Sequence, residues 1–109
     1  MLSNKTIFVT GGAGFIASHI IDRFIENNRI VIYDNLTRNA IRFTHILEHK
    51  NVEFIQGDVL AATKLTNAMR GADICVHAAA IAGIYSVGES VKRTMHVNLI
   101  GTYNALEAA

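Results

Sequence analysis

Hydrophobic and polar positions change along the chain in blocks that predict strands and helices in turn. Residues 5–10 (KTIFVT) and 29–33 (RIVIY) are short runs of β-branched and aromatic residues, which is typical of buried strands. Apolar residues recur at helical spacing between the two runs and predict one face of an amphipathic helix: Phe15, Ile16, Ile20, Ile21, Phe24 and Ile25. Asn27 and Asn28 follow, and asparagine tolerates the left-handed backbone that ends many helices.

The second half of the chain repeats this alternation. Residues 52–56 and 73–77 predict a third and a fourth strand. Between them, apolar residues from 60 to 69 predict a short helix that Gly71 stops. A long helix is expected from about Glu89 onward, with these residues on one side: Val91, Met95, Leu99, Thr102 and Leu106. Residues 35–50 have a weaker pattern, which suggests a polar loop and a short helix.

Alternating strands and helices predict an α/β fold, a Rossmann-like parallel sheet with helices on both faces. We expect residues 1–109 to form one domain that is truncated after about four strands. The crossover rule makes the first two strands parallel and adjacent. Ligands of such sheets bind outside the carboxyl ends of the strands, where we place Gly11, Asp34, Asp58 and Ala78.

Composition narrows the class of protein. Half of the residues are hydrophobic and the net charge is +1, which favours a soluble globular protein over a disordered or nucleic-acid-coating one. No apolar stretch approaches the roughly 18 residues that cross a bilayer, so we expect no membrane partner. The single cysteine, Cys75, excludes an internal disulfide and favours the cytoplasm.

Glycines mark the joint between the first strand and the first helix. They fit Gly11-x-x-Gly14-x-x-Ala17 or Gly12-x-Gly14-x-x-Ala17, so either Gly11 or Gly12 could form the sharp turn. A helix that begins there presents unpaired N–H groups and the positive end of its dipole, which together attract a phosphate group. The pattern therefore predicts a turn that binds the pyrophosphate of a dinucleotide.

Residues at the other strand ends extend this hypothesis. Asp34 lies about 20 positions beyond Gly14, where a carboxylate accepts hydrogen bonds from the adenosine ribose. The same charge repels a 2′-phosphate, which favours NAD over NADP, although Arg38 nearby argues the other way. Asp58 could bind the adenine amino group with Val59 packed on the ring, or it could be an ordinary turn residue. The small residues Ala78–Ala80 leave room for a dinucleotide or simply allow close packing.

Other motifs carry less weight. Residues 45–49 match the zinc-peptidase pattern H-x-x-E-H, but we see no third ligand and expect no metal site. We interpret His77 as a packed or hydrogen-bonded histidine and Cys75 as a buried apolar residue. Tyr85 and Ser86 lie in a loop at the active edge, where they could touch a substrate or simply face solvent.

These motifs together resemble the extended short-chain dehydrogenase/reductase family, especially its NAD-dependent nucleotide-sugar epimerases and dehydratases of the UDP-glucose 4-epimerase type. Five segments carry the resemblance in order: Thr10–Ser18, Tyr33–Leu36, Gly57–Val59, Asp73-x-x-x-His77-x-Ala79-Ala80 and Asn98-x-x-Gly101-Thr102. The resemblance implies an NAD site made by Gly11, Gly14, Phe15, Ile16, Asp34, Asn35, Asp58, Val59, Ala78, Ala79, Ala80 and Asn98.

The resemblance also shows what is missing. Family members use a tyrosine and a lysine four residues later as the acid/base pair, and no Tyr-x-x-x-Lys occurs here. The residues four positions after the three tyrosines are Thr37, Glu89 and Glu107. We therefore expect an amino-terminal fragment that has no catalytic residue of its own and holds NAD for a UDP-sugar epimerase.

Three alternative functions and one mode of self-association also remain open. The chain could belong to a nucleotide-sugar dehydratase or a decarboxylase instead of an epimerase. It could also be a non-catalytic module that binds or senses a dinucleotide. In the family the last helix helps to form a dimer, so the resemblance implies a homodimer through residues 89–109, with the open sheet edge as another route to self-association.

Overall fold

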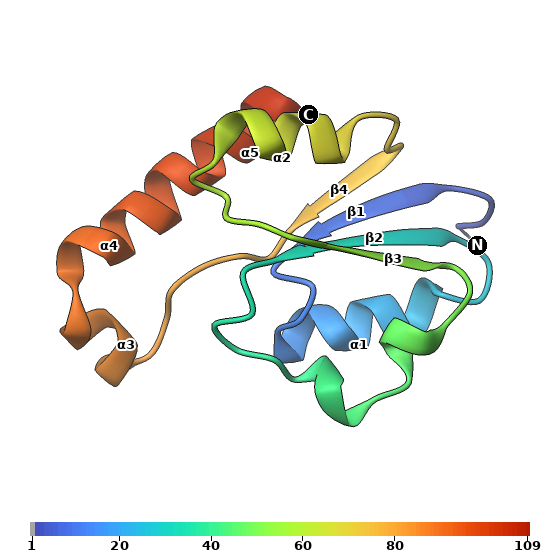
Figure 1. Ribbon diagram of the computed structural model, residues 1–109, viewed down its shortest axis with the longest axis horizontal. Coiled ribbons are helices and arrows are strands. Elements are labelled where there is room, and N and C mark those ends of the chain that lie inside the picture. The colour runs from blue at the N-terminus through green and yellow to red at the C-terminus, as the bar shows by residue number, and fades with distance from the viewer. Residues whose placement is uncertain (1) are drawn as a thin grey trace.

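A four-stranded parallel sheet forms the centre of the protein, whose computed structural model describes residues 2–109 (Figure 1). The strands are β1 (Thr6–Thr10), β2 (Arg29–Asp34), β3 (Val52–Gln56) and β4 (Ile74–His77). Their order is β3-β2-β1-β4, and every pairing is parallel. The predicted Rossmann-like sheet is therefore confirmed, as is the adjacency of the first two strands.

Helices cover both faces of this sheet (Figure 1). On one face lie α1 (Phe15–Phe24) and the 3₁₀ turns η1 (Ile41–Phe43) and η2 (Ile46–Glu48). On the other face lie α2 (Ala62–Met69) and the last helical stretch, which consists of α4 (Val91–Met95), the π-helical η3 (His96–Ile100) and α5 (Gly101–Ala108). The short α3 (Ile84–Glu89) projects beyond the carboxyl ends of the strands, away from both layers (Figure 1).

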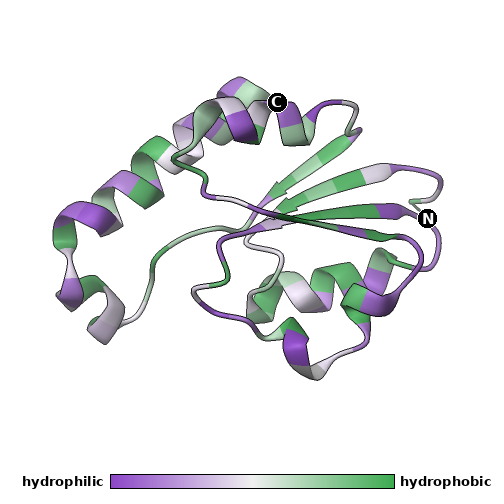
Figure 2. Cartoon of the chain, in the orientation of Figure 1, coloured by the Kyte–Doolittle hydropathy of each residue, from purple (hydrophilic) through white to green (hydrophobic). Residues whose placement is uncertain are grey.

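Side chains of the two central strands alternate between two cores, one on each face. Ile7 and Val9 of β1 pack with α1 and the 3₁₀ turns, whereas Phe8 between them packs with α2 and the last helix. In β2, Ile32 joins the first core and Tyr33 the second. Figure 2 accordingly shows strands that are mostly hydrophobic, as expected for strands that are buried on both faces.

The inward face of α1 differs from the expected one. Phe15 and Ile16 are 71% and 72% exposed, whereas Ala17, Ser18 and Ile21 are buried. The prediction that Phe15 and Ile16 belong to the core face is therefore wrong. The first turn of α1 directly follows the glycine turn at the strand ends, so its large side chains lie beyond the sheet and the small Ala17 makes the contact with it.

The turn after α1 is present, but not through a left-handed asparagine. Only Asn4 and Leu36 combine a side chain with a positive φ among the described residues, so neither Asn27 nor Asn28 is left-handed. Asn28 is 3% exposed instead, and its side chain binds three backbone groups. It accepts from Lys5 N at 3.1 Å and donates to Leu2 O at 3.1 Å and Phe24 O at 2.9 Å. The amide side chain thus caps the helix end and ties it to the start of the sheet.

The end of the chain is not one helix from Glu89, as predicted. Ser90 separates α3 from α4 and caps α4 with its hydroxyl, which accepts from Arg93 N at 3.1 Å. The side of the last helix that carries Val91, Met95, Leu99 and Leu106 faces outward, because each of these residues is more than half exposed. The buried positions are small or β-branched: Thr94, Val97, Gly101 and Ala105.

Residues 35–50 are also less regular than expected, because they form two 3₁₀ turns and no α-helix. Within residues 2–109, no helix combines the length and the apolar character that crossing a bilayer requires.

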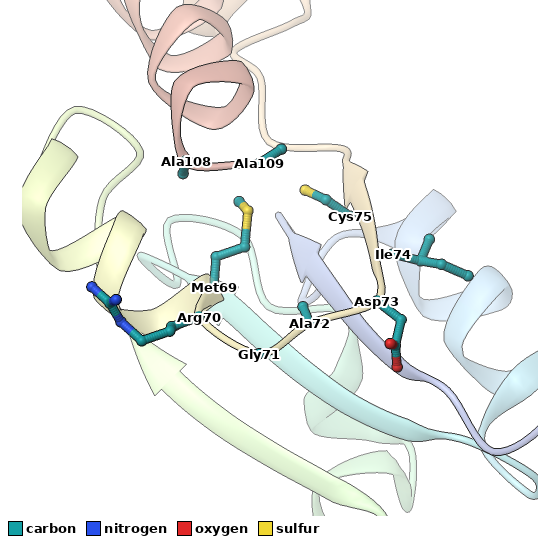
Figure 3. A pocket seen from close by; sticks show the side chains of 9 residues that line it. All are labelled: Met69, Arg70, Gly71, Ala72, Asp73, Ile74, Cys75, Ala108 and Ala109. Carbon is teal, nitrogen blue, oxygen red and sulfur yellow. The ribbon is translucent and has the colours of Figure 1, made fainter.

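A hollow of about 180 Å³ lies at the amino end of β4, at the other end of the sheet from the carboxyl ends of the strands. Met69, Cys75 and Ala108 are among its lining residues (Figure 3). Burial raises the pKa of the Cys75 thiol, which keeps it in its unreactive protonated form. No residue of the predicted site lines this hollow.

We expect Asn28→Ala to destabilise the protein by about 1–3 kcal/mol, because three part-buried backbone groups lose their partner together. Urea unfolding followed by circular dichroism measures this change. Asn27→Ala is the matched control, because Asn27 is exposed and none of these three bonds involves its side chain. Equal unfolding midpoints for the two variants would show that the capping interaction contributes nothing.

Candidate functional site

The glycine turn lies at the carboxyl end of β1, between the ends of β2 and β4. Gly11 has φ +67°, and a Cβ atom on it would lie 2.7 Å from Ala79 N and 2.8 Å from the carbonyl carbon of Ala78. Two features therefore exclude a side chain at this position: the left-handed backbone and the backbone of the neighbouring segment. Gly12 has no positive φ, so Gly11 makes the sharp turn that the sequence left open between the two.

Backbone N–H groups at the start of α1 face this turn without a side-chain cap. Gly14 is the N-cap residue, and the first hydrogen bond of the helix runs from Ser18 N to Gly14 O at 2.9 Å. The N–H groups of residues 15–17 consequently have no partner within the helix. No acidic residue lies in the first turn, so nothing offsets the positive end of the helix dipole. The turn can therefore bind an anion.

The Asp34 carboxylate braces the glycine turn from the neighbouring strand. It is 8% exposed, and its two oxygens accept from Ala13 N at 3.0 Å and from Leu36 N at 2.6 Å. Each carboxylate oxygen can accept a further hydrogen bond, so the group remains able to bind a hydroxyl. Asn35 follows with an exposed side chain that accepts from Thr37 N at 3.0 Å.

Asp58 is fixed at the end of β3 by contacts with two other elements. Its carboxylate accepts from Leu60 N at 2.9 Å and lies 3.6 Å from the Arg93 guanidinium of α4, while its carbonyl accepts from the Tyr33 hydroxyl at 2.9 Å. Burial raises the pKa of that hydroxyl, with the Asp58 charge as a second cause, so Tyr33 remains a donor. No sequence signal connected Arg93 with this site.

Val59 is 5% exposed and packs against α5, where a Cβ on Gly101 would lie 2.5 Å from its methyl carbon Cγ2. The expected packing of Val59 on an adenine ring stays a prediction, and the structure gives this side chain a core contact instead. The residue also holds the last helix through its carbonyl, which accepts from the Asn104 side chain at 2.9 Å.

The loop that begins with Ala78–Ala80 is held by Asn98. The Asn98 side chain accepts from Ile81 N at 2.8 Å and donates to Ile81 O at 3.0 Å, so both of its polar ends bind one loop residue. Asn98 lies inside the π-helical turn η3, and such turns are frequent at functional sites. In this structure its side chain positions the loop, and a contact with a cofactor stays a prediction.

His77 lies in a directed series of hydrogen bonds. The Thr102 hydroxyl donates to Asn98 O at 2.7 Å and therefore accepts from His77 Nε2 at 3.1 Å. Nδ1 of the neutral ring then accepts from the Thr10 hydroxyl at 2.6 Å, and that hydroxyl accepts from Ala79 N at 3.3 Å. The interpretation of His77 as a hydrogen-bonded residue is confirmed. The series ties the end of β1, the end of β4 and the π-helical turn together.

The structure thus places all the predicted site residues around the carboxyl edge, on the glycine turn, the strand ends and the adjoining turns of α1 and η3. The H-x-x-E-H residues lie elsewhere, on a 3₁₀ turn where His45 and His49 pair with Glu48 and Glu26. Within residues 2–109, no group of three or more His, Cys, Asp or Glu side chains is arranged to hold a metal ion.

Burial lowers the pKa of His77, so this residue contributes to the pH dependence of stability. The unfolded chain, in which histidine has its ordinary pKa of about 6.5, binds the proton more readily than the folded one. This contribution to stability is therefore present above about pH 6.5 and is lost as the pH falls from that value through the lower pKa of the folded state. We expect the unfolding temperature to fall less steeply between about pH 8 and pH 5 in His77→Gln than in the unmodified protein.

Calorimetry at several pH values measures the slope of the unfolding temperature against pH for each protein. His45→Gln is the control, because it also removes one imidazole, and His45 is exposed and lies outside the hydrogen bonds around His77. If the slopes of all three proteins coincide, His77 does not carry this pH dependence.

Comparison with known proteins agrees with the motifs and the fold. The model of the 3-beta hydroxysteroid dehydrogenase/isomerase family matches residues 8–109. A UDP-glucose 4-epimerase of Rickettsia typhi is 29% identical over 117 aligned positions, which cover 100% of this chain and 34% of that protein.

Solved structures extend the likeness to three dimensions. A UDP-N-acetylglucosamine 4-epimerase of Methanobrevibacter ruminantium, in complex with UDP-N-acetylmuramic acid, has a TM-score of 0.88 and 30% identity over 98% of this chain and 34% of its own. The dTDP-glucose 4,6-dehydratase DesIV of Streptomyces venezuelae, solved with NAD bound, has a TM-score of 0.85 and 27% identity over 95% of this chain and 35% of its own.

The chain thus spans about a third of the length of the relatives that it matches. The match runs through the glycine turn, all four strand ends and the last helix. The chain belongs to the 3-beta hydroxysteroid dehydrogenase/isomerase family and is similar to nucleotide-sugar epimerases and dehydratases.

Proposed function

We propose that this chain is the NAD-binding part of a nucleotide-sugar 4-epimerase that acts on a UDP-sugar. The observation that carries the proposal is the uncapped start of α1 behind Gly11, with the Asp34 carboxylate bonded to the middle of the same turn. A phosphate site and a ribose site therefore lie side by side, as a dinucleotide requires. The similarity to epimerases that bind or act on UDP-linked sugars supports the choice of substrate.

Each group of residues has a part in holding the cofactor. The N–H groups of Phe15 and Ile16 bind the pyrophosphate, which approaches closely because Gly11 and Gly14 lack side chains. The exposed side chains of Phe15 and Ile16 flank it. At the other strand ends, Asp34 and Asn35 bind the adenosine ribose, Asp58 and Val59 border the adenine, and Ala78–Ala80 border the path toward the nicotinamide.

Bound NAD supplies an acceptor, and then a donor, for the hydride that leaves and returns to a sugar carbon. The residues of this chain orient the cofactor and hold the loop beside it through Asn98 and His77. None of Tyr33, Tyr85 and Tyr103 has a lysine four positions later, so we assign no catalytic residue within the 109 residues. The expected inactivity of this chain alone follows from that assignment.

Three other functions remain candidates. The likeness to a dTDP-glucose 4,6-dehydratase supports a dehydratase, and the fold is equally compatible with a decarboxylase. Assays of the full-length protein separate them by product: an epimerase gives a sugar of unchanged mass, a dehydratase removes water and a decarboxylase releases carbon dioxide. A non-catalytic sensing module would bind NAD, change its interaction with a partner and convert no nucleotide sugar.

The single half-buried free cysteine supports the cytoplasm as the location of the protein.

We also propose a homodimer through the last helix. Five large side chains on its outer side are 51–73% exposed: Val91, Met95, Leu99, Tyr103 and Leu106. They recur at helical spacing and form one apolar stripe along α4, η3 and α5, which a second copy would cover around a two-fold axis. The resemblance to the family supports this occupant of the stripe.

We expect calorimetric titration to show at least tenfold tighter binding of NAD than of NADP, since the Asp34 carboxylate repels a 2′-phosphate. Asp34→Asn should reduce the ratio of the two affinities, because it removes the charge. General damage to the turn would lower the affinities for NAD and NADP alike, so it would leave their ratio unchanged. Asp58→Asn is the control, because it should change both affinities alike at the adenine end. A protein that binds neither dinucleotide would refute the proposed function.

We expect Leu99→Glu to shift the protein from dimer to monomer in sedimentation experiments, because a charge replaces an apolar side chain that is 59% exposed at the middle of the stripe. Ala62→Glu adds the same charge on the exposed side of α2 and should leave the dimer intact. A protein that is already monomeric at high concentration, or a dimer that survives Leu99→Glu, would contradict the assembly.

A further inference from the structure

The loop that follows β2 is anchored at both of its ends to Ala13 of the glycine turn. Ala13 N donates to the Asp34 carboxylate at 3.0 Å, and Ala13 O accepts from Ala40 N at 2.8 Å. Residues 34–40 thus form a hoop that begins and ends at the turn. Arg38 lies within the hoop, and its side chain contacts a different part of the chain.

Arg38 joins this hoop to the loop that follows β4. Its Nη2 donates to Ala82 O at 3.2 Å and to the Ser86 hydroxyl at 3.0 Å. Ser86 lies in α3, which projects beyond the sheet edge (Figure 1). Ala82 precedes Gly83, whose φ of +96° lets the loop turn toward the guanidinium. Arg38 is exposed, so both bonds lie at the surface of the candidate site.

The order of the strands determines what this connection crosses. β1 lies between β2 and β4 in the sheet, and the glycine turn is the carboxyl end of β1. A bond between the loops after β2 and β4 therefore spans the glycine turn. A dinucleotide whose pyrophosphate lies on that turn would therefore lie beside this connection.

The hoop also contains two locally unfavourable features. Leu36 has φ +63°, a left-handed backbone that side chains rarely adopt. Oδ1 of Asn39, next to Arg38, is buried and has no hydrogen-bond partner within residues 2–109. A segment that contains an unfavourable backbone angle and an unpaired buried acceptor is easier to open than a fully satisfied one.

We propose that Arg38 is a latch across the cofactor crevice: by joining the loops after β2 and β4 over the glycine turn, it slows both the entry and the release of the dinucleotide. The inference rests on the proposed function for the identity of the ligand. The latch itself rests on contacts within the chain. Arg38 acts through the two loops and is thus a positioning residue.

A latch has a kinetic signature that distinguishes it from a residue that binds the ligand directly. In the full-length protein, we expect Arg38→Met to raise the association and dissociation rates of NAD about tenfold, which corresponds to about 1.4 kcal/mol off both barriers. The dissociation constant should stay within a factor of about two, because both rates change together. Stopped-flow measurement of NAD exchange gives both rates.

Two further variants sharpen this test. Ser86→Ala removes one acceptor and keeps the guanidinium charge, so both rates should rise by a smaller factor, about threefold. Arg70→Met removes an equal charge at the far end of α2, where Arg70 donates to Asn67, and should change neither rate. If Arg38→Met instead weakens binding and lowers the association rate, Arg38 is a direct phosphate ligand and the latch is refuted.

Hydrogen exchange tests the latch without any ligand. Amides of residues 82–89 should exchange faster in Arg38→Met than in the unmodified protein, because the loop and α3 lose their connection to the hoop. Unchanged exchange in this segment would overturn the latch even if NAD binds as proposed. If NAD does not bind at all but exchange becomes faster, the Arg38 connection between the two loops stands, whereas the proposed function and the effect of Arg38 on dinucleotide exchange both fail.

Discussion

The candidate site depends on one close contact between two backbone segments at the carboxyl ends of the strands. Gly11 approaches the Ala78–Ala79 backbone so closely that a Cβ atom would lie less than 3 Å from it. β1 and β4 can therefore end side by side, with Ala78 N bonded to Thr10 O at 3.0 Å. The left-handed turn at Gly11 then directs the chain into α1, so that the start of the helix faces the edge where the other strands end. A larger residue at this position would displace the turn and the loop together.

Polar side chains then extend this arrangement from the sheet to the last helix. Asn98 and Thr102 are four residues apart across the π-helical turn, and both reach the β4 end, Asn98 through Ile81 and Thr102 through His77. Each of these part-buried side chains is hydrogen-bonded within the protein, which makes the arrangement specific rather than merely compact. The apolar cores hold the layers together, and these hydrogen bonds determine how the loops lie at the edge.

The parts of this structure that follow from the sequence are those governed by chain periodicity and by strand topology. Short β-branched runs predicted all four strands, and the parallel topology brought their ends together. Helix faces were less predictable, because large apolar residues are not always the buried ones: Gly101 and Ala105 pack inward, while Leu99 and Leu106 face out. Close packing on Val59 requires small residues, which a search for large apolar residues overlooks. The contacts of Asn28, Arg38 and Arg93 join distant segments and have no local signal.

Cofactor preference and the integrity of the turn are coupled through Asp34. The residue whose charge is proposed to disfavour a 2′-phosphate also accepts from Ala13 N and Leu36 N, so it is part of the turn that is proposed to bind the pyrophosphate. An amide in its place has one oxygen and would direct an NH₂ group at one of the two N–H donors. Arg38, the cation that argued for NADP in the sequence, donates to Ala82 and Ser86 instead. Acceptance of NADP in place of NAD would therefore require a rebuilt turn and a freed arginine in addition to the loss of the Asp34 charge, so the proposed preference for NAD depends on the whole turn.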